Sequence, residues 1–167
     1  MEQREVIRVT RAVSASKRVI RMVRENEGAT NHGDGCDART LATAERKLGL
    51  VFPPSYRCLL SEFGTWDIAG TEFIGVYKRS VLGDVLLGSV GQTLQARREV
   101  GLPHDLIVVM VDDVWAYVVL DASREDHAGE YPVCAWNPGL PDRDSMERVG
   151  DDFGSFALKE CQRAMGL

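Results

Sequence analysis

The 167-residue sequence predicts an α+β fold with N-terminal helices, a central antiparallel β-sheet and a C-terminal helix. Three observations support this class. Apolar residues recur at helical spacing up to residue 63, short β-branched runs follow from residue 71, and helical spacing returns after residue 153. Because the strand-like runs follow one another instead of alternating with helices, we expect antiparallel hairpins and not a parallel sheet.

The first predicted helix, residues 2–25, is amphipathic and basic. Residues 1–28 contain seven Lys or Arg and four Asp or Glu. We expect this helix to pack on the body of the domain, because its apolar face has no Trp or Phe to anchor it in lipid. A membrane surface, a partner helix or a second copy of the chain are the alternatives. The predicted buried face consists of Val6, Val9, Val13, Ser16, Ile20 and Val23.

Glycine and proline mark the ends of the next two predicted helices. These helices begin the α+β body, which we expect to comprise residues 37–167. Residues 26–36 are rich in Gly and Asn and predict a loop. Asp37 or Thr40 can cap a helix that ends at Gly49. Pro53 and Pro54 can start a second helix, which Gly64 ends.

The second half of the chain predicts strands joined by polar turns, with one helix inside and one at the end. The inner helix is Ser89–Val100, capped by Ser89, and the last is Phe153–Met165, capped by Asp151–Asp152. Asp112–Asp113 form the turn of a central hairpin. The expected strands are Thr71–Tyr77, Leu106–Val111, Trp115–Leu120, Tyr131–Trp136 and a short piece near Met146–Val149.

Composition excludes several classes of protein. Hydrophobic residues make up 44% and charged residues 27%, as in globular domains. No apolar run approaches the ~20 residues of a membrane span, and the first residues lack the features of a secretory signal. The four cysteines form no CxxC pair, so we expect reduced thiols and a cytoplasmic location.

The net charge of −5 is concentrated in the body, since residues 1–28 are net positive. An acidic body repels phosphates, which argues against binding nucleic acid. It would steer a basic protein partner toward the domain. The alternative is that the acidity serves solubility alone.

No set of residues has the spacing of a catalytic, cofactor or metal site. The glycines before residue 89 fit neither phosphate-loop pattern, and Gly154–Ser155 lacks the flanks of a nucleophile elbow. His32 and Cys36 are only two potential ligands, with no second pair. We therefore expect a protein that is not an enzyme and holds no cofactor or metal.

Aromatic and acidic residues near strand ends predict one binding surface. Aromatic side chains in such positions anchor interfaces, although they are as often part of a core. Acidic neighbours would add complementarity to a basic partner. The candidate partner-binding residues are Trp66, Asp67, Glu72, Asp112, Asp113 and Trp136.

The segment AERKLGLVFPPSYRCLLSEFG resembles the signature of the SUKH superfamily. Three later segments resemble YobK-like members in the same order: GTEFIGVY a strand, LPHDLIVVMVDDVWAYVVLD the central hairpin, and DDFGSFALKE the capped last helix. The resemblance spans roughly residues 40–165. Val114 stands where the hairpin turn commonly has a glycine. The signature positions here are Glu45, Leu48, Gly49, Pro53, Tyr56, Leu60 and Gly64.

The resemblance implies an α+β domain whose bacterial members are largely immunity proteins. They bind and neutralise a toxin, often a nuclease or another nucleic-acid-modifying enzyme. The leading hypothesis is a cytoplasmic immunity protein that occludes a basic toxin domain. The main alternative is a non-catalytic scaffold or regulatory module that uses the basic helix as its contact, and an enzyme is a third. The oligomeric state stays open.

Replacing Asp112 and Asp113 together with Lys is expected to weaken binding to a basic toxin and to reduce the salt dependence of that binding. Titration of toxin at two ionic strengths measures both effects. Unchanged affinity would remove this turn from the binding surface.

Overall fold

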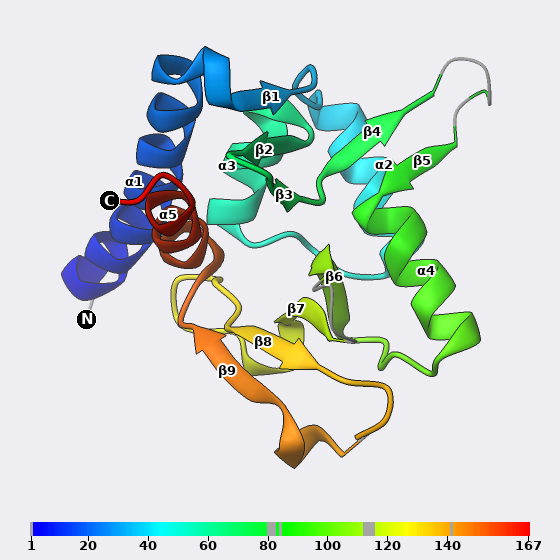
Figure 1. The fold of residues 1–167 in the computed structure, drawn as a ribbon. Helices are drawn as coiled ribbons and strands as arrows, with labels where there is room; N and C mark the ends of the chain where they lie inside the picture. Colours follow the sequence, from blue (N-terminus) through cyan, green and yellow to red (C-terminus); the bar gives the residue numbers. More distant parts are fainter. Residues whose placement is uncertain (1, 80–82, 84, 112–115, 141) are drawn as a thin grey trace.

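A computed structural model describes residues 2–79, 83, 85–111, 116–140 and 142–167, with the side chains of residues 2–10 left aside. Figure 1 shows helices grouped around three small antiparallel sheets, which confirms the predicted α+β class. The helices are α1 (Glu2–Glu25), α2 (Ala38–Leu48), α3 (Pro54–Phe63), α4 (Ser89–Glu99) and α5 (Phe153–Ala164). The strands are β1 (Thr30–His32), β2 (Trp66–Ile68), β3 (Thr71–Phe73), β4 (Val76–Lys78), β5 (Leu86–Gly88), β6 (Leu106–Val111), β7 (Tyr117–Asp121), β8 (Val133–Trp136) and β9 (Glu147–Gly150).

The capping residues set the ends of α2, α3 and α5 as predicted. The Asp37 carboxylate accepts a hydrogen bond from the Thr40 backbone N–H at 2.7 Å, and Gly49 ends α2 with a φ of 71°. Pro54 is the first residue of α3, and Gly64 follows its last turn. The Asp152 carboxylate caps α5 by accepting from the Ser155 N–H at 2.7 Å.

Helix α1 lies against α3 and α5, so the first and last helices of the chain are side by side (Figure 1). Its exposed side chains include Arg11, Lys17, Arg18 and Arg21. The buried stripe is rotated from the predicted one, since Val13 and Ile20 are only partly buried. Ala12 and Ala15 take the place predicted for Val13, and their small side chains allow close approach of the neighbouring helices. The buried residues are Ala12, Ala15, Ser16, Val19 and Val23.

The segment predicted as a loop at residues 26–36 contains strand β1, and Trp66 is the first residue of strand β2. Strands β1, β2 and β3 form one sheet in which β2 is central. The predicted strand Thr71–Tyr77 is divided into β3 and β4, which belong to different sheets. The division falls at Gly75, where a Cβ would lie 1.4 Å from the Gly64 carbonyl oxygen. Only glycine permits this close approach.

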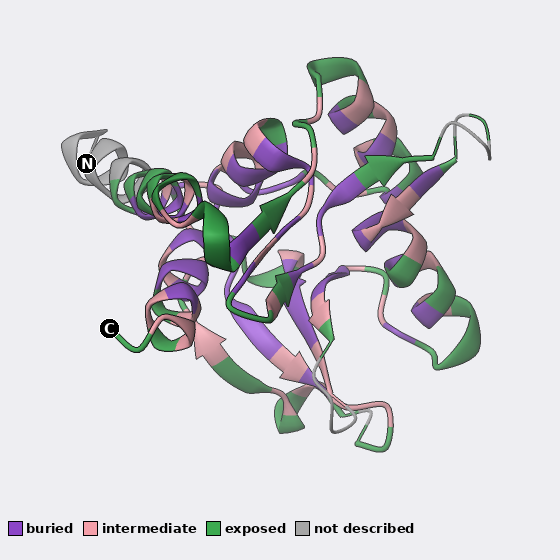
Figure 2. Ribbon diagram, turned by 45° about the horizontal axis from the view of Figure 1, so that its top comes forward, coloured by how far each residue is buried: buried purple, intermediate pink, exposed green. Residues whose placement is uncertain are grey.

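The four-stranded sheet has the order β6-β7-β8-β9 and separates two hydrophobic clusters. Successive residues of β6 point to opposite faces: Ile107 and Val109 enter the main core, whereas Leu106 and Val108 enter a smaller cluster with Trp136. Both faces of β6 are therefore buried, and the predicted strand Leu106–Val111 is confirmed (Figure 2).

Helix α4 begins as predicted, but Ser89 does not cap it. Gly88 is the residue before the first turn and has no side chain to offer. The Ser89 hydroxyl instead donates to the Val108 carbonyl at 2.5 Å, and the Thr93 hydroxyl accepts from the Val108 N–H at 2.9 Å. These two bonds attach α4 to β6. Within the described residues, no helix has the length and apolarity needed to cross a membrane.

Candidate functional site

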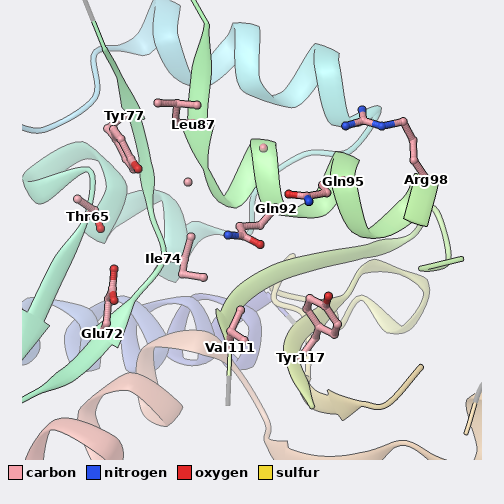
Figure 3. Close-up of a pocket in the computed structure, with 12 residues that line it drawn as sticks. Thr65, Glu72, Ile74, Tyr77, Leu87, Gln92, Gln95, Arg98, Val111 and Tyr117 are labelled. Atoms are coloured by element: carbon pink, nitrogen blue, oxygen red, sulfur yellow. The ribbon is translucent and has the colours of Figure 1, made fainter. Parts of the chain in front are cut away.

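A cleft of about 550 Å³ opens where α4 meets all three sheets. We call it the α4 cleft. Side chains from β3, β4, β5 and α4 line it, together with Val111 at the end of β6 and Tyr117 at the start of β7 (Figure 3). Tyr77 and Val111 are 39% and 49% exposed, so the apolar part of the wall is open to solvent. The lining residues are Thr65, Glu72, Ile74, Tyr77, Leu87, Gly88, Gly91, Gln92, Gln95, Arg98, Val111 and Tyr117.

Backbone hydrogen bonds hold the walls of the α4 cleft in place. The Ile74 N–H donates to the Val109 carbonyl at 2.9 Å and joins β3 to β6. The Ser89 N–H donates to the Gly75 carbonyl at 2.7 Å and joins the start of α4 to the β3–β4 connection. A wall held by backbone contacts is preformed for a ligand.

An acidic pair, Asp67 and Glu72, stands on the outer face of the β1-β2-β3 sheet. The two residues are directly opposite each other in the antiparallel register of β2 and β3, so their side chains share a face. The amide of Asn31 on β1 donates to both Asp67 carboxylate oxygens, at 3.3 and 3.1 Å. Glu72 is exposed and also lines the α4 cleft. Two like charges facing each other weaken a sheet, so folding alone does not favour this pair.

Replacing Glu72 with Thr is expected to stabilise the folded protein while weakening partner binding. Thr suits an exposed strand position, and its presence removes the repulsion from Asp67, a gain of roughly 0.5 kcal/mol. Urea unfolding measures the stability of the variant, and titration with the partner measures the affinity. A variant that is more stable and binds equally well would show that Glu72 is not a contact.

The structure places both candidate tryptophans in the core. Trp66 and Trp136 are 2% and 1% exposed. Trp66 stacks on Phe73 with ring centroids 5.1 Å apart, and Trp136 packs against Tyr117 with centroids 5.9 Å apart. The expectation that these two indoles stand on the binding surface is therefore wrong, because both side chains are part of hydrophobic clusters in the core.

Of the candidate residues that the structure describes, Glu72 lines the α4 cleft, and Asp67, Trp66 and Trp136 do not. Glu72 shares the cleft with Val111 and Tyr117, the last register pair of the β6–β7 hairpin. Asp112 and Asp113 lie outside the described residues, so their place on this surface stays a prediction.

Sequence reasoning missed the α4 side of the cleft. Gln92, Gln95 and Arg98 are exposed and recur every three residues along the helix. Spacing of this kind puts side chains on one face. Gly91 in the first turn of α4 also marks this side of the helix, because glycine weakens a helix and is unfavourable there unless the missing side chain serves a purpose.

Two features of the described residues bear on metal binding and on thiol reactivity. None of these residues form a cluster of three or more His, Cys, Asp or Glu side chains that could hold a metal. Burial raises the pKa of the Cys36 thiol to about 11 and that of Cys161 to about 12. Both thiols are therefore protonated at neutral pH, and a protonated thiol is a poor nucleophile.

A second polar cluster is buried and joins four segments. The backbone N–H and hydroxyl of Ser55 donate to the Glu130 carboxylate at 2.9 and 2.6 Å. The Ser55 hydroxyl accepts from the Gly154 N–H at 3.1 Å, and the Ser16 hydroxyl donates to the Ser55 carbonyl at 2.9 Å. Glu130 is 1% exposed, and burial raises its pKa to about 7. This cluster connects α1, α3, α5 and the β7–β8 connection, so its role is structural.

The fold and the cleft together define a class: a small α+β domain whose preformed surface is suited to binding. Comparison with known families makes this specific. The SUKH family model described as SMI1-KNR4 cell-wall matches residues 16–162. The chain belongs to the SUKH family. This membership supports an immunity-like or cell-wall-related role exerted through protein–protein interaction. No curated protein matches the chain.

Proposed function

We propose that the chain is a cytoplasmic, non-enzymatic immunity protein that binds a basic bacterial toxin and neutralises it by direct occlusion. The observation that carries this proposal is the acidic pair on β2 and β3, in which Asp67 is half-buried and Glu72 is exposed at the edge of an open cleft. Family membership supports a binding role, and the net charge of −5 favours a cationic partner.

Occlusion fits the chemistry of such a toxin. A nuclease binds phosphates through cationic side chains. Carboxylates on the immunity protein can pair with those same side chains and exclude the substrate. Asp112 and Asp113 directly follow strand β6 in sequence, and we assign them to the same surface in this proposal.

Capture followed by rescue tests the proposed function. The full chain is used to isolate a partner with a basic domain from its own cell lysate, and the two are then co-expressed. Growth of cells that carry both, but not of cells that carry the toxin alone, is expected. Glu72→Lys should reduce the rescue, whereas Glu147→Lys at an exposed position of β9 is the matched control. A partner that is lethal with or without the chain would overturn the proposal.

The exposed basic face of α1 favours a second candidate, a scaffold or regulatory module. Val19 and Val23 are fully buried, so deleting residues 1–25 would expose the core. A loss of binding in that variant could then result from unfolding. Reversing two exposed charges, Arg18→Glu with Arg21→Glu, leaves the core intact. Loss of wall-synthesis or signalling partners in this variant, with no toxin recovered by the parent chain, would favour the scaffold.

A further inference from the structure

The α4 cleft carries opposite charges at its two ends. Glu72 lies with Thr65 and Tyr77 at one end, and Arg98 stands at the other, with Gln92 and Gln95 between them (Figure 3). Neither Glu72 nor Arg98 forms an ion pair with another described residue. The two charges are therefore available to a ligand.

Gly91 leaves the middle of the cleft open on the α4 side. A Cβ at this position would meet only the Leu86 carbonyl oxygen, at 3.9 Å, so packing does not require glycine. Its φ lies outside the left-handed region. Glycine nevertheless costs a helix about 0.5–1 kcal/mol relative to Ala. The absence of a side chain is useful where another backbone approaches closely.

We infer that the α4 cleft binds an extended segment of the partner protein, with a Lys or Arg side chain at Glu72 and an Asp or Glu side chain at Arg98. This inference rests on the proposed function and names the part of the toxin that is recognised. The main chain of the segment lies over Gly91. The amide of Gln92 can donate to and accept from its peptide groups, and the carbonyl oxygen of Gln95 can accept from them while its NH2 group donates to the Glu99 carboxylate.

The geometry of α4 sets the spacing of the recognised residues. Arg98 follows Gln92 by six positions along α4, which is a rise of about 9 Å. An extended chain covers this distance in about three residues. Because Glu72 lies beyond Gln92, the basic and acidic residues of the segment are three or more positions apart.

Other ligand classes fit the cleft less well. A phosphate backbone would pair with Arg98 but would be repelled by Glu72 and by the acidic body. An apolar molecule would remove both charges from water without pairing them. A peptide with both charges satisfies both ends.

Selection from a library of random 12-residue peptides displayed on phage tests this inference without the toxin. The full chain is expected to enrich peptides with a basic and an acidic residue at the stated spacing. Gly91→Leu should lower the affinity of a selected synthetic peptide at least about tenfold, because the side chain fills the cleft. Gly28→Leu is the matched control, since no atom lies within 4 Å of a Cβ there.

Charge reversal gives a second readout. Glu72→Lys and Arg98→Glu should each shift the selected motif at their own end, and Lys159→Glu on α5 should not. Enrichment of the same peptides by Gly91→Leu, or of peptides without charges, would overturn the inference. Toxin rescue separates the two proposals. If Gly91→Leu rescues cells fully, the α4 cleft is not the toxin-binding site, but the immunity function stands. If the parent chain fails to rescue cells, the immunity function itself is rejected.

Discussion

Gly154→Ala is expected to destabilise the protein by about 2 kcal/mol or more. Gly154 lies in the first turn of α5, where α5 crosses α1. A Cβ there would be 2.1 Å from the Ala12 carbonyl oxygen and 2.8 Å from the Ser16 hydroxyl. Because the closest atom belongs to the backbone, one helix must move to admit the methyl group. Helix propensity alone would favour Ala by about 1 kcal/mol, so packing reverses the sign.

Thermal unfolding measures the effect, and a fall in the midpoint of about 5 °C or more is expected for a domain of this size. Gly91→Ala is the matched control, because it is the same change in the first turn of another helix with free space around the Cβ. It should leave the midpoint unchanged or raise it. Equal behaviour of the two variants would mean that α1 and α5 do not pack as closely as described.

Glu130 is expected to make the folded state less stable as the pH rises. Its pKa is about 7 in the folded chain, chiefly because burial disfavours the charged form, against an ordinary value of 4.5. Between these two values the folded state holds the proton and the unfolded state does not. The free energy of unfolding therefore decreases as the pH rises through this window, by about 3 kcal/mol in total.

Glu130→Gln isolates this contribution from that of the other carboxyl groups. The Gln amide cannot titrate, while its oxygen can still accept from the Ser55 N–H, so the variant should lose the decrease between pH 4.5 and 7. Urea unfolding at several pH values gives the slopes of both proteins. If the free energies of unfolding of the two proteins changed with pH in parallel, Glu130 would have an ordinary pKa, and its hydrogen bonds to Ser55 would offset the effect of burial.

The helices were predictable because interactions between residues close in sequence set their ends. Asp37, Gly49 and Asp152 act through bonds to residues within a few positions, so the sequence alone contains the information. Strand β6 was also predictable, since a continuous apolar run reflects burial on both faces. In these elements, local preference and tertiary packing agree.

The binding surface was only partly predictable because it depends on distant contacts. Strands β1 and β2 have three residues each, so any alternation in them is too short to predict a strand, and they form by pairing with each other. Trp66 lies in such a strand, so nothing nearby indicated that its indole is covered by Phe73. Glu72 was identified from charge, but the α4 residues of the cleft lie about 20 positions or more further along the chain, and their spacing on one face of the helix does not show what that face meets.

The pairing of the first helix with the last has a consequence during synthesis. Helix α1 leaves the ribosome before α3 and can meet it early, but its contact with Gly154 must wait until α5 has been made, more than 120 residues later. At roughly 5–20 residues per second this takes many seconds. Throughout that time the apolar stripe of α1 is only half covered beside its exposed arginines. A nascent chain in this state is a substrate for chaperones, and we expect ribosome-bound chains truncated before α5 to be far more sensitive to protease in α1 than full-length chains.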